Sequence, residues 1–310
     1  MITRTALRHP DRTFVMGILN VTPDSFSDGG QWMDLNSAIA RGYRLVDQGA
    51  DIIDVGGEST RPGAQALSSG EEWDRIGAVV KALAQAGIAV SIDTYHAATA
   101  RLAVEAGAVI INDVTGGAGD PSMFSTVAGL GCMYVLQHTR GTPETMNSLA
   151  SYESVPGEVA AELEESVRRA VGSGIDRSNI IVDPGFGFAK NADHNWDLAA
   201  HFEAVEALGQ PVLIGVSRKR FLEEVAPDSV PSSRDNATAT LTGYFASRGV
   251  WGVRVHEVAA SKAAILTAER LRESGAFTGQ GAFRGRATPG NREASGGDRE
   301  ASGGSEGSDA

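Results

Sequence analysis

The chain has 310 residues, of which 42% are hydrophobic and 21% are charged. This composition suits a globular protein with a substantial core and excludes a fibrous or wholly disordered one. A formal charge of -12 argues against general binding to nucleic acid or to anionic lipid. The single cysteine, Cys132, excludes a disulfide framework within the chain and fits a reducing compartment, so we expect a cytoplasmic protein. No apolar run approaches the roughly 20 residues that cross a bilayer, so we expect no membrane association.

Short apolar runs rich in Val and Ile alternate along the chain with longer segments of helical period. This alternation is typical of repeated βα units, whose strands are buried on both faces of a parallel sheet. Strands are expected at residues 13–20, 52–55, 89–93, 109–113, 133–138, 180–183, 212–216 and 253–255. Helices are expected at residues 35–48, 71–85, 99–106, 157–171, 195–208, 236–248 and 258–272.

Eight βα units within one domain of this length predict an α/β fold, a closed (β/α)8 TIM barrel, with an open doubly wound sheet as the alternative. From Ala276 onward the sequence changes to Gly, Ser and charged residues. Such a segment cannot bury enough apolar surface to offset the entropy of ordering. We therefore expect a single barrel domain over residues 1–275 and a disordered tail over residues 276–310.

A polar residue stands at or near the carboxyl end of every predicted strand. One strand-terminal Asp has an ordinary explanation, because Asp caps helices and nucleates turns. A ring that also contains Lys, Arg and His is better explained by chemistry at the catalytic face of a parallel barrel. His138 is the exception, and we interpret it as a structural histidine at a strand end. The other members are Asn20, Asp54, Asp93, Asn112, Asp113, Asp183, Ser217, Lys219, Arg254 and His256.

Two long motifs carry a resemblance to a known family. MGILNVTPDSFSDGG at residues 16–30 and DVGGESTRPG at residues 54–63 resemble the two signatures of the dihydropteroate synthases. Later segments follow in the family's order: SIDT, INDVTGG, DPGFGFAK, GVSRKRF and VRVHEV. The resemblance covers roughly residues 14–271, which includes the whole expected barrel.

The resemblance implies an enzyme, a transferase of folate biosynthesis. Its reaction condenses 6-hydroxymethyl-7,8-dihydropterin diphosphate with p-aminobenzoate, giving 7,8-dihydropteroate and diphosphate. The resemblance also implies Mg2+ as cofactor and a homodimer, with these two small molecules as substrates.

The same resemblance assigns roles to particular residues. Catalysis is expected of Asp93, Asp183, Lys219 and Arg61, and magnesium binding of Asn20, with Asp54 as a weaker neighbour. The pterin is expected to contact Asp93, Asn112, Met133, Asp183, Lys219 and Arg254. The diphosphate is assigned to Asn20, Arg61, Arg254 and His256, and p-aminobenzoate to Thr60, Pro62, Phe188 and Ser217.

Two other functions remain open at this point. A noncatalytic pterin-binding paralogue would keep the polar ring without turnover. A folate-dependent methyltransferase barrel would need no diphosphate site, so Arg61 and the pair Arg254 and His256 count against it.

Overall fold

The computed structural model describes residues 4–8, 10–21, 31–58, 67–142 and 145–276, with the side chains of Arg4 and of residues 31–34 excepted. The second predicted signature loop and the expected tail therefore lie largely outside the described residues. Within the described part of the chain, no helix is both long enough and apolar enough to span a membrane.

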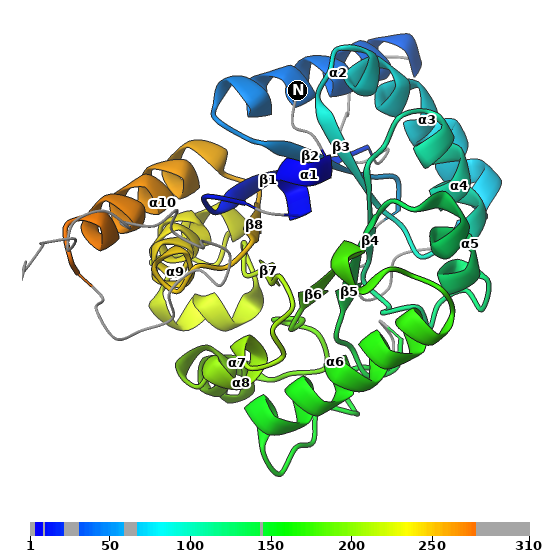
Figure 1. Ribbon diagram of the computed structural model, residues 1–310. Coiled ribbons are helices and arrows are strands. Elements are labelled where there is room, and N and C mark those ends of the chain that lie inside the picture. The colour runs from blue at the N-terminus through cyan, green and yellow to red at the C-terminus, as the bar shows by residue number, and fades with distance from the viewer. Residues whose placement is uncertain (1–3, 9, 22–30, 59–66, 143–144, 277–310) are drawn as a thin grey trace, which may run out of the picture.

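Eight parallel strands form the centre of the molecule (Figure 1). Their order is β6-β5-β4-β3-β2-β1-β8-β7, and a bridge between Val182 and Val212 joins the two outer strands. The sheet is thus closed, which confirms the predicted (β/α)8 barrel and excludes the open doubly wound sheet. The strands are β1 (Phe14–Asn20), β2 (Ile52–Gly56), β3 (Ala89–Asp93), β4 (Ile110–Asp113), β5 (Met133–Gln137), β6 (Ile180–Asp183), β7 (Leu213–Ile214) and β8 (Gly252–Val255).

Helices surround the strands and follow recognisable local signals. Helix α3 begins at a capping box, in which Ser68 and Glu71 satisfy each other's backbone N–H groups. Helix α6 begins with Pro in its first turn, where the missing N–H costs nothing. The helices are α1 (Arg4–Arg8), α2 (Gln31–Asp47), α3 (Ser69–Gln85), α4 (Ala97–Glu105), α5 (Met123–Leu130), α6 (Val155–Gly172), α7 (Ala192–Ala200), α8 (Glu203–Glu206), α9 (Asp235–Ser247) and α10 (Val258–Glu273). Short 3-10 helices cover Arg177–Asn179, Arg220–Val225 and Pro231–Arg234.

One helical prediction is wrong, and two helices lie outside the predicted ranges. Helix α5 was not anticipated, because its eight residues include glycine and show little separation of polar and apolar faces. The helix expected at 195–208 is two helices, α7 and α8, with a break after His201, whose φ of -113° is not helical. Helix α1 was not anticipated either, since five residues are too few to show a helical period.

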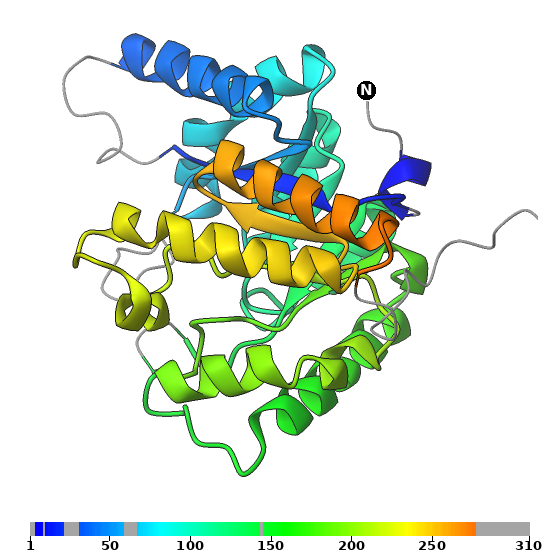
Figure 2. The same cartoon turned by 90° about the vertical axis from the view of Figure 1, so that its left-hand side faces the viewer.

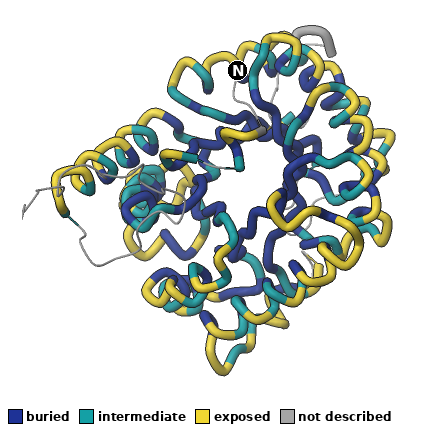
Figure 3. Tube along the Cα trace, viewed as in Figure 1, coloured by how far each residue is buried: buried dark blue, intermediate teal, exposed yellow. Residues whose placement is uncertain are grey.

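The core has two parts. The larger part lies between the strands and the helices, and includes Val15, Ile53, Val79 and Phe245. The smaller part fills the barrel interior near the amino ends of the strands, and includes Met16, Ile110 and Ile181. Figure 3 shows the result as a buried ring of strands inside helices whose outer faces are exposed.

Helix α1 covers the end of the barrel at which the strands begin (Figure 2). The Trp251 indole N–H donates to the Leu7 carbonyl oxygen at 2.7 Å, and the Trp251 ring packs edge-on against Phe14. Both Leu7 and Trp251 are buried. In the described part of the chain this end is therefore closed, and the carboxyl ends of the strands form the open end of the barrel.

Candidate active site at the carboxyl ends of the strands

A cluster of charged side chains from β2, β3, β4 and β8 occupies the open end of the barrel. The Arg254 Nε donates to Asp54 Oδ2 at 2.6 Å, and its Nη2 donates to Asp93 Oδ2 at 2.6 Å. The Asn112 amide also donates to Asp54 Oδ2, at 3.1 Å. Among the described residues, the other oxygen of Asp54 has no hydrogen-bond partner although it is buried. The structure thus brings together four of the predicted polar residues, with Asp54 and Asp93 on the Arg254 guanidinium and Asn112 on Asp54.

The opposite wall comes from β6 and the segment after β7. Asp183 is buried, and its Oδ1 accepts a hydrogen bond from the Gly185 amide at 2.7 Å. Its Oδ2 faces Gly215, where a Cβ would stand only 3.2 Å away. The Lys219 ammonium lies 4.0 Å from the centre of the Phe188 ring, a cation–π contact. A side chain at Gly187 would collide with Lys219, so glycine at that position leaves room for the lysine.

Burial sets the protonation behaviour of this cluster. Burial raises the pKa of Asp93 to about 7, against the opposing charge of Arg254. Burial likewise raises the pKa of Asp183 to about 6, against its hydrogen bond from Gly185 and the charge of Lys219. The pKa of Lys219 falls to about 8, because burial and the neighbouring Arg254 disfavour its ammonium form. The carboxylates are thus short of donors, and a ligand that presents N–H groups would supply them.

Ser217 and His256 form a second pair beside this cluster. Ser217 Oγ lies 2.9 Å from His256 Nδ1 and accepts from the His256 backbone N–H at 3.1 Å. Asn20 ends β1 beside Gly56 of β2, with its side chain exposed to the open end. Asn20 is exposed and His256 is half-buried, so an anion could approach both from solvent. The structure therefore places the predicted diphosphate residues Asn20, Arg254 and His256 on the same rim.

Thr60, Arg61 and Pro62 lie outside the described residues. Their predicted roles toward the diphosphate and p-aminobenzoate stay predictions. Phe188 and Ser217, the other two residues predicted for p-aminobenzoate, both lie at the open end, on the segments that follow β6 and β7.

The structure places Met133 in the core, and its predicted contact with the pterin stays a prediction. Met133 is the first residue of β5, and it is buried in the apolar cluster near the amino ends of the strands. Side chains alternate along a strand, so Gln137 shares its face but stands at the carboxyl end, paired with Asp183 of β6. Gln137 is therefore the β5 residue at the mouth, and Met133 belongs to the core.

The sequence did not predict the role of Arg218, which lies between Ser217 and Lys219 and sets their orientation. Arg218, between them, has a φ of 59°, an uncommon conformation for a residue with a side chain. Its guanidinium makes two hydrogen bonds to Asp235 at 2.7 and 2.8 Å, and its carbonyl oxygen accepts from Arg234 at 2.8 Å. Arg218 stood in the GVSRKRF motif, but no sequence signal joined it to Asp235 seventeen residues later.

A divalent cation would find oxygen donors at this rim. The described residues contain no group of three or more His, Cys, Asp or Glu side chains that could hold a metal by themselves. Asn20 offers an exposed amide oxygen, and Asp54 keeps one oxygen without a partner among the described residues. Magnesium prefers oxygen ligands and retains waters, so one or two protein ligands plus substrate phosphate fit it.

Comparisons with known proteins agree with this geometry. A family described as "Pterin binding enzyme" matches residues 16–256. The dihydropteroate synthase of Mycobacterium leprae (strain TN) is 47% identical over 253 residues, covering 80% of this chain and 89% of that protein. The structure of the Xanthomonas albilineans dihydropteroate synthase with 4-aminobenzoic acid superposes with a TM-score of 0.79 at 41% identity, covering 84% of this chain and 94% of that one. The same enzyme in complex with 7,8-dihydropteroate gives a TM-score of 0.75 at 38% identity, with the same coverage.

Proposed function

Because this chain belongs to the dihydropteroate synthase family of pterin-binding enzymes, we propose that it condenses 6-hydroxymethyl-7,8-dihydropterin diphosphate with p-aminobenzoate. The chain is accordingly a transferase. The observation that carries the proposal is the cluster at the open end of the barrel, in which Asn112 and Asp183 are buried and Asp93, Lys219 and Arg254 are half-buried. A neutral heterocycle with both N–H groups and a carbonyl oxygen complements such a set.

The pterin occupies the floor of the mouth. Asp93 and Asp183 accept hydrogen bonds from its amino and ring N–H groups, and Asn112 can both donate and accept. Lys219 donates to the carbonyl side of the ring. The raised pKa values of the two aspartates support this placement, since each carboxylate would gain donors on binding.

The diphosphate lies at the rim, where positive and polar groups face solvent. Asn20, Arg254 and His256 bind its oxygens there, together with Arg61 from the DVGGESTRPG segment. A magnesium ion held by Asn20, with Asp54 nearby, would add positive charge beside the leaving diphosphate. The partnerless oxygen of Asp54 among the described residues supports a cation or donor at this place.

The chemical step is a displacement at the exocyclic methylene carbon of the pterin. The bond from this carbon to the diphosphate oxygen breaks, and its electron pair leaves with the diphosphate. The amino nitrogen of p-aminobenzoate then attacks the carbon and releases a proton to solvent. Asp93 and Asp183 stabilise the positive charge that develops on the pterin ring, while Arg61 and Arg254 stabilise the departing anion.

The second substrate lies above the pterin. Phe188 and Ser217, with Thr60 and Pro62, form its pocket, and the ammonium of Lys219 stands beside the Phe188 ring. An aniline nitrogen is neutral at pH 7, so the pocket needs to orient the nucleophile and exclude water rather than deprotonate it.

The protein acts in the cytoplasm as a homodimer that forms through its outer helices. Exposed apolar side chains on α10, Leu266 and Leu271, support a surface that a second copy covers. Sedimentation of the purified chain tests this part, and a monomer at micromolar concentration would contradict it.

Release of diphosphate in the presence of both substrates tests the reaction. We expect release to require both the pterin diphosphate and p-aminobenzoate, and to give dihydropteroate in equal amount. Binding of the pterin without turnover would indicate the noncatalytic paralogue instead. Methyl transfer from a reduced folate would indicate the methyltransferase.

A further inference from the structure

The loop between β6 and α7, residues 184–191, has an uncommon backbone. Gly185 and Gly187 have φ values of 70° and 75°, and Ala189 has a φ of 47°. The glycines adopt this region at no steric cost, whereas the Cβ of Ala189 makes it strained. A Cβ at Gly185 would come within 1.9 Å of the His138 carbonyl oxygen, so the loop lies directly against the end of β5. Such a loop needs contacts that hold its shape.

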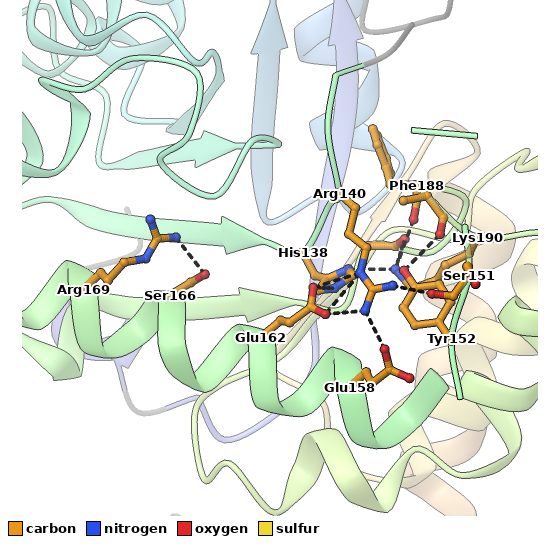
Figure 4. Close-up of polar contacts among 12 residues, drawn as sticks. His138, Arg140, Ser151, Tyr152, Glu158, Glu162, Ser166, Arg169, Phe188 and Lys190 are labelled. Carbon is orange, nitrogen blue, oxygen red and sulfur yellow. Dashed lines mark hydrogen bonds and ion pairs between the residues drawn. The ribbon is translucent and has the colours of Figure 1, made fainter. Parts of the chain in front are cut away.

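Lys190 supplies these contacts from the inside. Its side chain is buried, and the ammonium group donates to the carbonyl oxygens of Gly185 and Phe188, both at 3.1 Å. The same Nζ lies 2.9 Å from Nδ1 of His138. An ammonium has three N–H donors, and here three acceptors surround it. The side chain therefore ties two points of the loop to the end of β5 (Figure 4).

His138 in turn contacts Glu162 of α6. Its Nε2 lies 3.0 Å from Glu162 Oε2, so a neutral ring accepts from Lys190 at Nδ1 and donates to Glu162 at Nε2. Burial and the charge of Lys190 lower the pKa of His138 to about 4, which keeps the ring neutral. Burial also lowers the pKa of Lys190 to about 7, with Asp183 and Glu162 acting to raise it.

A second path returns from Glu162 to the loop. Glu162 pairs with Arg140, whose guanidinium stacks on the Tyr152 ring at 3.9 Å. The Tyr152 hydroxyl then donates to the carbonyl oxygen of Ala189 at 3.0 Å. Lys190 and Tyr152 thus bind the consecutive carbonyl groups of Phe188 and Ala189. Figure 4 shows the side chains of Lys190 and Tyr152 beside those of Arg140 and Glu162. We call these five residues, Lys190, His138, Glu162, Arg140 and Tyr152, the loop clamp.

The loop clamp acts unequally on the two substrates. Asp183 belongs to β6 itself, and its carbonyl oxygen accepts from the His138 backbone N–H at 2.8 Å, so the strand ladder holds it without Lys190. Phe188 has no strand to hold it, and Lys190 binds its carbonyl directly. Loss of the clamp should therefore move Phe188 away from Lys219, whereas the strand ladder keeps the backbone of Asp183 in place.

We propose that Lys190 and Tyr152 are positioning residues for p-aminobenzoate, which act by fixing the Phe188 wall of its pocket from beneath. The inference rests on the proposed function, because it assigns this loop to the second substrate. None of the five clamp residues was among the residues predicted from sequence to touch a substrate.

Steady-state kinetics of Lys190→Met test the proposal. We expect the KM for p-aminobenzoate to rise at least about tenfold, while the KM for the pterin diphosphate stays within about threefold. Tyr152→Phe keeps the ring under Arg140 and removes only the hydroxyl, so it should shift the same KM by about threefold. Lys81→Met, an exposed lysine on α3, is the matched control and should change neither constant.

A structural role alone would lower the melting temperature and the active fraction without separating the two KM values. Equal changes in both KM values, or no change, would overturn the proposal. If Lys190→Met does not fold, an unchanged p-aminobenzoate KM in Tyr152→Phe overturns it. Absence of turnover by the parent chain would overturn the proposed function and this inference with it, whereas normal parent turnover with unaltered variants would remove the inference alone.

Discussion

Each end of the barrel contains an aspartate, but the two carboxylates differ in how many hydrogen-bond donors surround them. At the closed end, Asp51 accepts two hydrogen bonds from Arg12 at 2.7 and 2.6 Å and one from the Val15 amide at 2.9 Å. At the open end, the Asp183 carboxylate accepts one hydrogen bond from the described residues, that of the Gly185 amide. Both carboxylates are largely removed from water. The difference lies in how many donors the fold supplies.

The pKa values of these two aspartates move in opposite directions. Burial alone would raise the pKa of Asp51, but the hydrogen bonds from Arg12 and Val15 outweigh it and hold the pKa below its usual value. Burial dominates at Asp183 and raises its pKa to about 6. Asp51 therefore stabilises the folded chain, whereas Asp183 destabilises it until a ligand supplies donors. The closed end serves stability and the open end serves binding.

Trp251→Ala should break the closed end with the largest effect. It removes a buried ring, its packing against Phe14 and its hydrogen bond to Leu7. We expect a loss of about 3–5 kcal/mol in the free energy of unfolding. Urea denaturation measures this loss, and kcat of the folded fraction should stay within about threefold. A large fall in kcat at full folding would show that the two ends are not separate.

Asp183→Asn should break the open end. The variant keeps the shape but removes the charge and presents an N–H to a donor edge of the substrate. We expect kcat/KM for the pterin diphosphate to fall by a hundred- to a thousandfold, about 3–4 kcal/mol. The ligand-free protein should remain fully folded. Turnover within threefold of the parent would reduce Asp183 to a turn residue ahead of Pro184.

The pH dependence of stability sharpens the same contrast. The pKa of Asp183 is higher in the folded chain than in the unfolded chain. Between about pH 4 and 6 the folded parent therefore binds a proton that the unfolded chain does not. The contribution of Asp183 to stability is present at low pH and is lost as the pH rises through about 6. Asp183→Asn should thus be more stable than the ligand-free parent at pH 8, by on the order of 1–3 kcal/mol, and equal to it near pH 4. Urea denaturation of both proteins at several pH values gives this difference. A variant that is less stable at pH 8 would contradict the assigned pKa direction.

The smallest expected effect is that of Asp235→Asn, and Asp51→Asn is its control. Asp235→Asn removes the ion pair that holds Arg218 at its φ of 59°. The neighbouring Ser217 and Lys219 then lose their fixed orientation toward the site. We expect kcat/KM to fall about tenfold, with about 1 kcal/mol of stability lost. Asp51→Asn at the closed end is the matched control, and it should lose stability alone. If the two variants lower kcat/KM equally, Arg218 does not position Ser217 and Lys219.

Local patterning determined most of the architecture. Alternating apolar and amphipathic segments placed all eight strands within a few residues, because strands buried on both faces and helices with one buried face leave distinct periods in a sequence. The same pattern placed Asp93, Asn112, Asp183 and Arg254 at strand ends, and the motifs identified the family. It failed where a helix was short, as for α1 and α5, since so few residues show no period.

Tertiary structure decided which side chains meet and what charge they carry. Met133 and Gln137 share one face of β5, and the closed barrel buries the first in its inner apolar core while the second lies at the carboxyl end beside Asp183. The sequence could not join Lys190 to His138 across 52 residues, or Arg218 to Asp235. Burial depends on the packing of distant segments, so the opposite pKa shifts of Asp51 and Asp183 arise only when the chain is folded. Residue type and order fixed what each strand end could offer, and the fold decided which of those groups lacked a partner.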